Sequence, residues 1–86
     1  MQESVFRSRL EAINFLESAG MIKHGVAWYM PGQYVCRHGE YSKPDYKPVK
    51  TKDGWKIKVK TYFYPGRFVF GRSTYMTVDE EMLLSA

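Results

Sequence analysis

Three lysines alternate with apolar residues in residues 55–70, the stretch of this chain with the clearest periodicity and the densest positive charge. In a strand, successive side chains point to opposite faces. Lysine ammonium groups neutralise phosphates and aromatic rings stack on bases, a combination typical of sequence-tolerant nucleic-acid binders. The stretch therefore predicts a strand with a basic, aromatic face of Lys56, Lys58, Lys60, Tyr62 and Tyr64 and an apolar face of Trp55, Ile57, Val59, Thr61 and Phe63.

Arginines elsewhere in the chain could add to this basic face. Arg67 and Arg72 belong to the next predicted strand, and Arg7 and Arg9 lie near the start of a predicted helix. The candidate nucleic-acid-binding residues are Lys56, Lys58, Lys60, Tyr62, Tyr64, Arg67, Arg72, Arg7 and Arg9. The alternative is that the lysines solubilise an exposed sheet face and discourage edge pairing, and that the helix arginines are simply solvated.

The side chains that could bind a soft metal are those of Cys36, His38 and His24. Cys36 and His38 could also act as a thiol nucleophile with a histidine as its base. A zinc site needs four ligands, and the chain has no Cys-x-x-Cys motif. Nothing at a recognisable spacing supplies an orienting acid or an oxyanion hole, and no phosphate-binding glycine loop is present. We expect no metal, no cofactor and no enzymatic activity.

The length of 86 residues predicts one small domain, 1–86, which buries only about 60% of the surface of its unfolded chain. A hydrophobic fraction of 44% argues against a disordered chain. A single cysteine cannot form an intramolecular disulfide, and no apolar run approaches the roughly 18 residues of a membrane span. We expect a cytoplasmic protein that does not enter a membrane.

The net charge of +4 is unevenly distributed along the chain. Residues 37–72 contain ten Lys or Arg against three acids, whereas the last 14 residues carry a charge of −3. A positive charge concentrated in one region favours a polyanionic partner, and DNA is a more probable partner than RNA.

Residues 4–19 are predicted to form an amphipathic helix that packs on the sheet, because Phe6, Leu10, Ile13 and Leu16 recur at helical spacing. Ser4 could cap its start, or Ser8 with Glu11 could form a capping box instead. Near the other terminus, Thr77-Val78-Asp79-Glu80 is a capping box that predicts a short C-terminal helix.

Two hairpin turns are expected, and a third segment could form either a hairpin or a loop. Lys52-Asp53-Gly54 should join residues 46–51 to 55–64, and Pro65-Gly66 should join that strand to 67–75, with positive φ at Gly54 and Gly66. Around Pro31-Gly32, residues 26–30 and 33–37 could form a hairpin with Val26, Trp28 and Met30 on one face, or a loop. Residues 38–48 are expected to cross the surface without regular pairing.

The expected fold class is α+β, with the N-terminal helix packed on an antiparallel β-sheet of hairpins and a short C-terminal helix. The aromatics Trp28, Tyr29, Tyr34 and Tyr41 should lie mostly in the core. If several were exposed together, they would form a protein-binding patch.

Over about residues 9–72 the order of motifs resembles the C-terminal domain of phage antirepressor proteins, the KilAC type. The matching segments are Phe15-Leu16 with Gly20-Met21-Ile22, Met30-Pro31-Gly32-Gln33-Tyr34, Gly39-Glu40-Tyr41, Asp53-Gly54-Trp55-Lys56-Ile57-Lys58-Val59 and Pro65-Gly66-Arg67-Phe68-Val69-Phe70. The resemblance implies a phage or prophage regulator with a winged-helix-like architecture, in which residues 53–72 would be the wing. The family's N-terminal DNA-binding domain has no counterpart in this sequence.

Two functions follow from these patterns. The first is a small phage or prophage regulatory protein, involved in transcription regulation, that binds nucleic acid through the basic hairpin. The second is a protein-binding inhibitor or antirepressor that occludes a host or phage protein without binding nucleic acid. The sequence indicates no oligomeric state.

Overall fold

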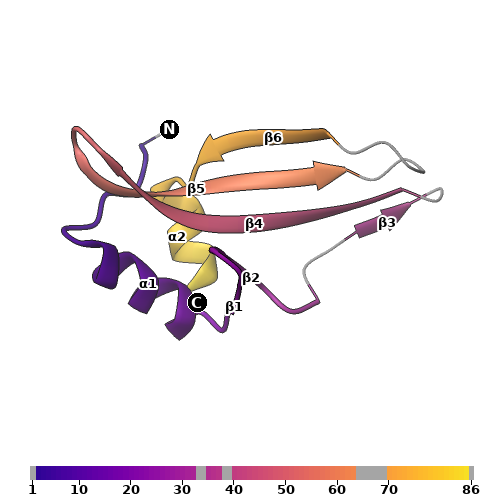
Figure 1. The fold of residues 1–86 in the computed structure, drawn as a ribbon, viewed down its shortest axis with the longest axis horizontal. Coiled ribbons are helices and arrows are strands. Elements are labelled where there is room, and N and C mark those ends of the chain that lie inside the picture. Colours follow the sequence, from indigo (N-terminus) through magenta and orange to yellow (C-terminus); the bar gives the residue numbers. More distant parts are fainter. Residues whose placement is uncertain (1, 33–34, 38–39, 64–69, 86) are drawn as a thin grey trace.

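The computed structural model describes the backbone of residues 2–32, 35–37, 40–63 and 70–85, and the side chains of residues 2–32, 44–61 and 73–85. Within these residues the chain forms two helices and six strands (Figure 1). In chain order they are α1 (Arg9–Ser18), β1 (Ile22–His24), β2 (Ala27–Tyr29), β3 (Val35–Arg37), β4 (Glu40–Thr51), β5 (Gly54–Phe63), β6 (Phe70–Tyr75) and α2 (Val78–Leu84). The predicted α+β class, with a helix at each end of the chain and the sheet between them, is confirmed.

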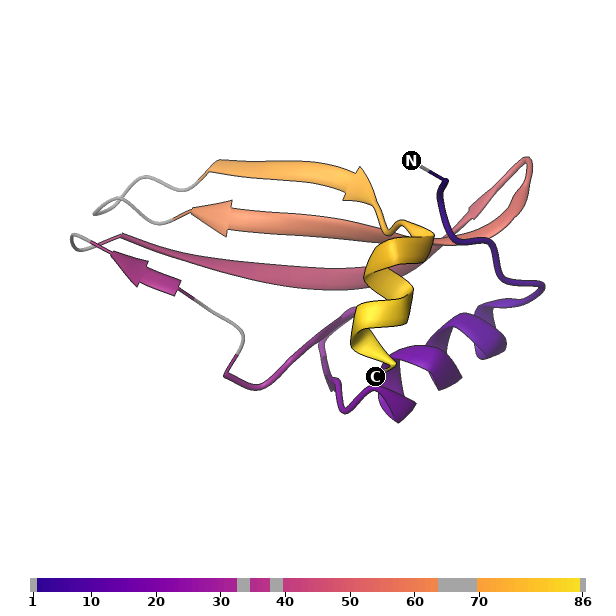
Figure 2. The ribbon, with the colours of Figure 1, turned by 180° about the vertical axis from the view of Figure 1, so that it is seen from behind.

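All described strands belong to one antiparallel sheet in the order β1-β2-β4-β5-β6, and β3 pairs separately with the start of β4. The molecule is elongated, with extents of 40 × 27 × 25 Å. Both helices and the β1–β2 hairpin gather at one end, while β3 and the far ends of the long strands extend away from them (Figures 1 and 2). The core formed by the described side chains therefore lies at the end of the sheet where the helices gather.

The predicted turn between β4 and β5 is confirmed. Thr51 pairs with Gly54, so Lys52 and Asp53 form a two-residue loop, and the two strands form ten residue pairs in all, this one included. Gly54 has φ of 126°, as expected for a residue that the turn holds at positive φ. The Pro65-Gly66 turn and residues 67–69 lie outside the described residues, so the expectation for Gly66 is not tested.

The N-terminal helix begins at the later of the two starts that the sequence predicts. Ser8 is its cap, and the Ser8 hydroxyl accepts a hydrogen bond from the Glu11 backbone N–H at 3.1 Å. The prediction that residue 4 begins the helix is wrong, because the Ser4 N–H donates to the Met76 carbonyl instead. Residues 3 and 6 form bridges to Thr77 and Trp55, so this segment is extended and fastened to the sheet.

The buried face of α1 also differs from the predicted stripe. Leu16 and Ala12 are fully buried, but Leu10 is 65% exposed. Phe6 is buried from the extended segment, and its ring lies 5.7 Å from that of Phe15. The predicted stripe is partly wrong because Phe6 lies outside α1. A stripe that includes Phe6 places Leu10 on the buried face, whereas the helix buries Ala12 and Leu16.

The middle of the chain pairs differently from the hairpin considered around Pro31-Gly32. β2 turns back on β1 through Gly25 and Val26, and Trp28 then pairs with Tyr46 of β4. β3 pairs with β4 as well, so β2 and β3 are not partners of each other, and residues 33 and 34 lie outside the described part. Val26 is 70% exposed, in contrast to the buried Trp28.

The prediction of an unpaired crossing over residues 38–48 is wrong from residue 40 onward, because β4 begins at Glu40 and pairs continuously with β5 from Ser42. Pro44 and Pro48 suggested a loop, since proline cannot donate to a β-ladder. On the side of β4 away from β5, however, the paired residues are 40–42 and 46. Both prolines therefore lie where β4 is paired on one side only, a position that tolerates proline.

The hydrophobic core lies between the sheet and the helices. Ile57 and Val59 are buried as the alternation predicted, and Trp55 is partly buried beside them. Trp28 is 2% exposed, and its indole N–H donates to Glu17 Oε2 at 3.1 Å. The buried hydrophobic residues are Phe6, Ala12, Leu16, Met21, Trp28, Tyr46, Ile57, Val59 and Met76.

The C-terminal helix carries the predicted capping box. The Thr77 hydroxyl accepts from the Glu80 backbone N–H, and the Glu80 carboxylate accepts from the Thr77 backbone N–H. The whole sheet separates α2 from α1 in the chain, so the described residues contain no helix-turn-helix. The likeness to a winged-helix arrangement is limited to a helix packed on hairpins.

Replacing Gly54 by Asn should destabilise the protein by about 2 kcal/mol, because φ of 126° is unfavourable for any residue with a Cβ. The new Cβ would also lie 3.2 Å from the Phe6 carbonyl oxygen. The matched control is Gly25→Asn, since Gly25 has φ of 65° and open space around it, where Asn should cost less than about 1 kcal/mol. Urea unfolding measures both, and equal losses would contradict the close approach at Gly54.

The two candidate caps of α1 can be separated by mutation. Ser8→Ala should cost about 1 kcal/mol by removing the cap. Ser4→Ala should be neutral or stabilising, because the Ser4 hydroxyl is buried and no described group hydrogen-bonds to it. Thermal unfolding of the two variants provides the test, and a larger loss at residue 4 than at residue 8 would overturn the assignment.

Candidate nucleic-acid interface

The β4–β5 register brings basic residues of both strands onto one face of the sheet. Lys47 lies opposite Lys58, and Asp45 lies opposite Lys60. The intervening residues of both strands, Tyr46 and Val59 among them, point to the opposite side and are buried in the core. One face of the central sheet is therefore apolar and covered, and the other is polar and largely open.

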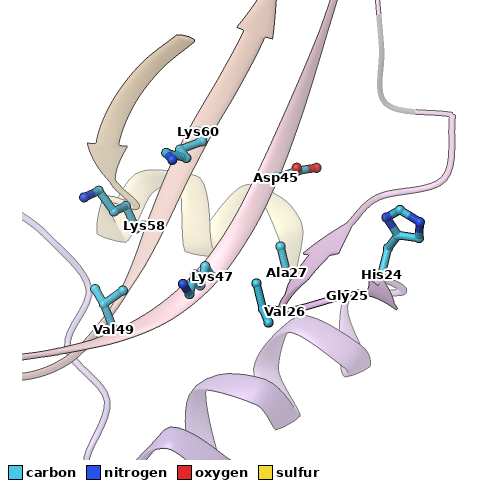
Figure 3. Close-up of a pocket in the computed structure, with 9 residues that line it drawn as sticks. All are labelled: His24, Gly25, Val26, Ala27, Asp45, Lys47, Val49, Lys58 and Lys60. Atoms are coloured by element: carbon cyan, nitrogen blue, oxygen red, sulfur yellow. The ribbon is translucent and has the colours of Figure 1, made fainter.

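A groove lies over this open face (Figure 3). Its floor comes from β4 and β5, and its wall is the β1–β2 hairpin with its turn at Gly25 and Val26. Its volume is about 470 Å³, in the range of small-ligand pockets. The residues that line it are His24, Gly25, Val26, Ala27, Asp45, Lys47, Val49, Lys58 and Lys60.

The charge in the groove is positive and unneutralised. The like charges of Lys47 and Lys58 face each other directly, an arrangement that destabilises a sheet unless an anion lies between them. No described carboxylate lies within 4 Å of Lys47, Lys58 or Lys60 to form an ion pair. Asp45 is the only acid among the groove residues. We define Lys47, Lys58 and Lys60 as the groove lysines.

The position of β5 in the sheet bears on the alternative explanation for its lysines. Lysine protects exposed sheet edges against pairing with other chains. β5, however, is flanked by β4 on one side and β6 on the other, so it is an interior strand. Edge protection therefore does not explain Lys58 and Lys60, although solubility of the open face still could.

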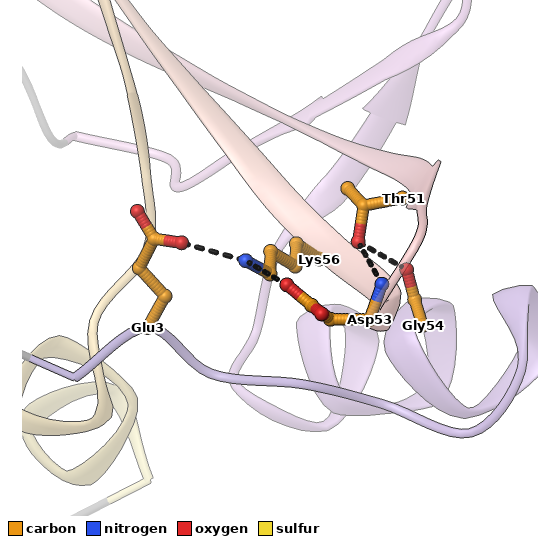
Figure 4. A network of polar contacts seen from close by, with 5 residues as sticks. All are labelled: Glu3, Thr51, Asp53, Gly54 and Lys56. Atoms are coloured by element: carbon orange, nitrogen blue, oxygen red, sulfur yellow. Dashed lines mark hydrogen bonds and ion pairs between the residues drawn. The ribbon is translucent and has the colours of Figure 1, made fainter.

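Lys56 has a different role from the groove lysines (Figure 4). Its Nζ lies 2.7 Å from Glu3 Oε1 and 3.4 Å from Asp53 Oδ2, and its side chain is 11% exposed. The Nζ is also 5.3 Å from the centre of the Tyr75 ring. The hydrogen bond to Glu3, together with both carboxylate charges, raises the pKa of Lys56 above its usual value. The expectation that all three β5 lysines are exposed is therefore wrong for Lys56.

The turn beside Lys56 holds Asp53 in place. The Thr51 Oγ1 accepts a hydrogen bond from the Asp53 N–H at 3.2 Å and donates one to the Gly54 carbonyl at 2.8 Å (Figure 4). Glu3 arrives from the extended N-terminal segment. Lys56 thus joins the turn to the N-terminus, which explains why its charge is already balanced.

The remaining candidate residues are distributed differently. Arg7 is 94% exposed, with Glu11 at 3.9 Å, and Arg9 is the first residue of α1. Because α1 packs against the buried face, these arginines belong to another part of the surface than the groove lysines. Tyr64 and Arg67 lie outside the described residues. Tyr62 and Arg72 belong to β5 and β6, but their side chains are not among those described.

Among the described residues, no group of three or more His, Cys, Asp or Glu side chains comes together to bind a metal. His24 lies in the groove, whereas His38 and the Cys36 side chain are outside the described part. None of the described helices has the length and apolar character needed to span a membrane.

Sequence reasoning missed part of the groove. Lys47 could have been found, because a two-residue turn at Lys52-Asp53 places it opposite Lys58. Val26 and the groove position of His24 had no comparable signal, since they depend on how the β1–β2 hairpin docks on β4.

Comparison with models of known protein families finds no match, and comparisons with curated proteins and with solved structures find none either.

Lys56 should stabilise the fold, whereas Lys58, two residues along the same strand, should not. A lysine whose pKa is raised by folding contributes stability that is fully present below its unfolded pKa of about 10.4 and is lost as pH rises through the higher folded pKa. Lys56→Gln should therefore lower the urea midpoint at pH 7, and the difference from the wild type should shrink as pH rises above 10.4. Lys58→Gln is the matched control, and it should lose no stability at pH 7, because it removes one of two opposed like charges. A Lys56→Gln deficit that persists undiminished above that range would contradict the ion-pair assignment.

Proposed function

We propose that this domain binds nucleic acid through the groove on the open face of its sheet, with the groove lysines contacting the phosphate backbone. The observation that carries the proposal is the directly opposed Lys47 and Lys58 pair, which has no ion-pair partner among the described residues. Phosphate is the anion that best fits such a pair, because each non-bridging oxygen accepts hydrogen bonds from an ammonium group.

The distribution of acids in the fold supports this proposal. Glu3 and Asp53 neutralise Lys56 at one end of β5, whereas Lys58 and Lys60 form no ion pair with any acid whose side chain the structure describes. The wall formed by the β1–β2 hairpin encloses the groove lysines on one side. Low-dielectric walls strengthen the field in a cleft lined by one sign of charge and raise the local concentration of anions.

On the basis of the resemblance to phage antirepressor C-terminal domains, we propose a more specific role. The domain is then a cytoplasmic phage or prophage regulator that acts on DNA in preference to RNA. The proposed contact surface is the groove and not the predicted hairpin face. It includes Lys47, which the hairpin face did not, and it excludes Lys56.

A protein-binding inhibitor is the second candidate function. α2 buries none of its residues, and Met82 and Leu83 are 65% and 78% exposed. Trp28 is buried, so the aromatic patch expected for this function does not form around it. An apolar partner surface would instead cover Met82 and Leu83.

The proposed function can be tested by replacing Lys47, Lys58 and Lys60 together with Gln. Binding to unrelated DNA sequences should weaken about equally, and the slope of log K against log salt should fall by about two to three units, near one per phosphate contact. Stability should stay within roughly 0.5 kcal/mol per substitution, as for most surface changes. Fluorescence anisotropy over a salt series measures the slope.

The matched control is Lys50→Gln with Lys52→Gln, which removes exposed lysines outside the groove. This variant should retain most of the wild-type slope. If the wild-type domain binds neither DNA nor RNA at low salt, the proposal fails. A stoichiometric protein partner that Met82→Ser with Leu83→Ser abolishes would then favour the inhibitor.

A further inference from the structure

We infer that the groove accepts a single strand of nucleic acid and discriminates against duplex. This inference rests on the proposed function and names its substrate class. It follows from four features of the groove: the close spacing of its charges, its concave shape, the carboxylate among the lysines, and the apolar side chains beside them.

The groove lysines are spaced for one backbone. Directly opposed residues on antiparallel strands have Cβ atoms about 4.5–5.5 Å apart, as for Lys47 and Lys58. Lys60 is two residues along β5, about 6.8 Å further. A cluster this compact can contact neighbouring phosphates of one strand with all three of its lysines.

The shape of the groove adds to this argument. The β1–β2 turn stands beside the lysines as a wall, and the space enclosed is about 470 Å³ (Figure 3). Proteins that recognise duplex DNA insert a helix or a two-stranded ribbon into its major groove, so the protein surface is convex at the contact. Here the protein is concave and its cavity has the size of a small ligand. A nucleotide of a flexible strand can enter it, whereas a rigid duplex cannot.

Asp45 distinguishes a base-bearing ligand from a simple polyanion. Its carboxylate lies in the groove opposite Lys60, where it repels phosphate. A carboxylate accepts hydrogen bonds from the amino groups of bases, such as N4 of cytosine. In a single strand the Watson–Crick edges that carry these groups are free. The groove therefore offers lysines to the phosphates and an acceptor to the base edge of the same strand.

Apolar side chains complete the site. Val26 is 70% exposed at the tip of the wall, and Val49 and Ala27 also line the groove. Water does not solvate these groups well, and the flat face of an unstacked base would cover them. In a duplex those faces are stacked on neighbouring bases and are not available. His24, the last residue of β1 before the turn, provides a further ring against which a base can stack.

The test compares one labelled 12-nucleotide sequence as a single strand and as a duplex, in DNA and RNA versions, by fluorescence anisotropy at a fixed low salt concentration. The single strand should bind about tenfold more tightly than its duplex in at least one of the two chemistries. An abasic strand of the same length, used as competitor, should bind about tenfold more weakly than the base-bearing strand. The DNA and RNA arms identify which backbone is preferred.

Two variants separate base contact from net charge. Asp45→Ala removes both the charge and the acceptor, and the control Asp79→Ala removes a charge in the exposed first turn of α2. Asp79→Ala should leave the ratio of single-strand to duplex affinity unchanged. Asp45→Ala should tighten duplex binding by removing repulsion of phosphate, but single-strand binding also loses the base contact, so that the ratio falls at least threefold.

The outcomes separate this inference from the proposed function. Equal binding of duplex and single strand, or equal competition by the abasic strand, would overturn the inference and leave nucleic-acid binding in place. An unchanged ratio in Asp45→Ala would also count against it. Absence of binding to every oligonucleotide would overturn both.

Discussion

The pairing of β4 with β5 is the constraint on which the rest of this structure depends. A two-residue turn sets its register, and Gly54, the residue after the turn, is held at φ of 126°. Since side chains alternate between faces, a shift of one residue would bring Lys58 into the core and expose Ile57. The other parts of the sheet attach to this pair: β6 joins β5, while β2 and β3 join β4. The core and the open face are consequences of one register.

The three lysines of β5 illustrate how long-range packing divides residues that look equivalent in sequence. They alternate in the same manner and share one face. Lys56, however, lies next to the turn, where the extended N-terminal segment crosses the sheet and brings Glu3 within 2.7 Å. Lys58 and Lys60 lie further along β5, beyond the reach of that segment. A structural ion pair and a candidate phosphate contact thus occur two residues apart on the same strand.

Local signals in the sequence predicted local structure well. The Asp53-Gly54 turn, the alternation through Ile57 and Val59, and the Thr77 capping box depend on neighbouring residues alone, and all three were confirmed. The exceptions are segments whose conformation depends on distant partners. Ser4 has the residue type of a helix cap, but the segment around it forms backbone hydrogen bonds with Met76 and Trp55 instead. The prolines of β4 argued for a loop, since their tolerance depends on where β2 and β3 end. For the same reason the lysines of the candidate site could be predicted in part, whereas its wall, which requires the docking of β1 and β2, could not.

A basic face becomes a binding site when its charges are concentrated and left without partners at a cost to stability. The fold neutralises Lys56 with two carboxylates. It nevertheless sets Lys47 against Lys58, which raises the energy of the empty sheet. A surface selected for solubility alone gains nothing from this opposition, because solubility depends on net charge and lysines spread over the surface would serve equally. A surface that receives phosphate gains from it, because a bound anion removes the repulsion between the two ammonium groups while it forms its own contacts. The opposed pair is therefore the feature of the open face that solubility alone does not explain, and the proposed phosphate site would relieve its repulsion.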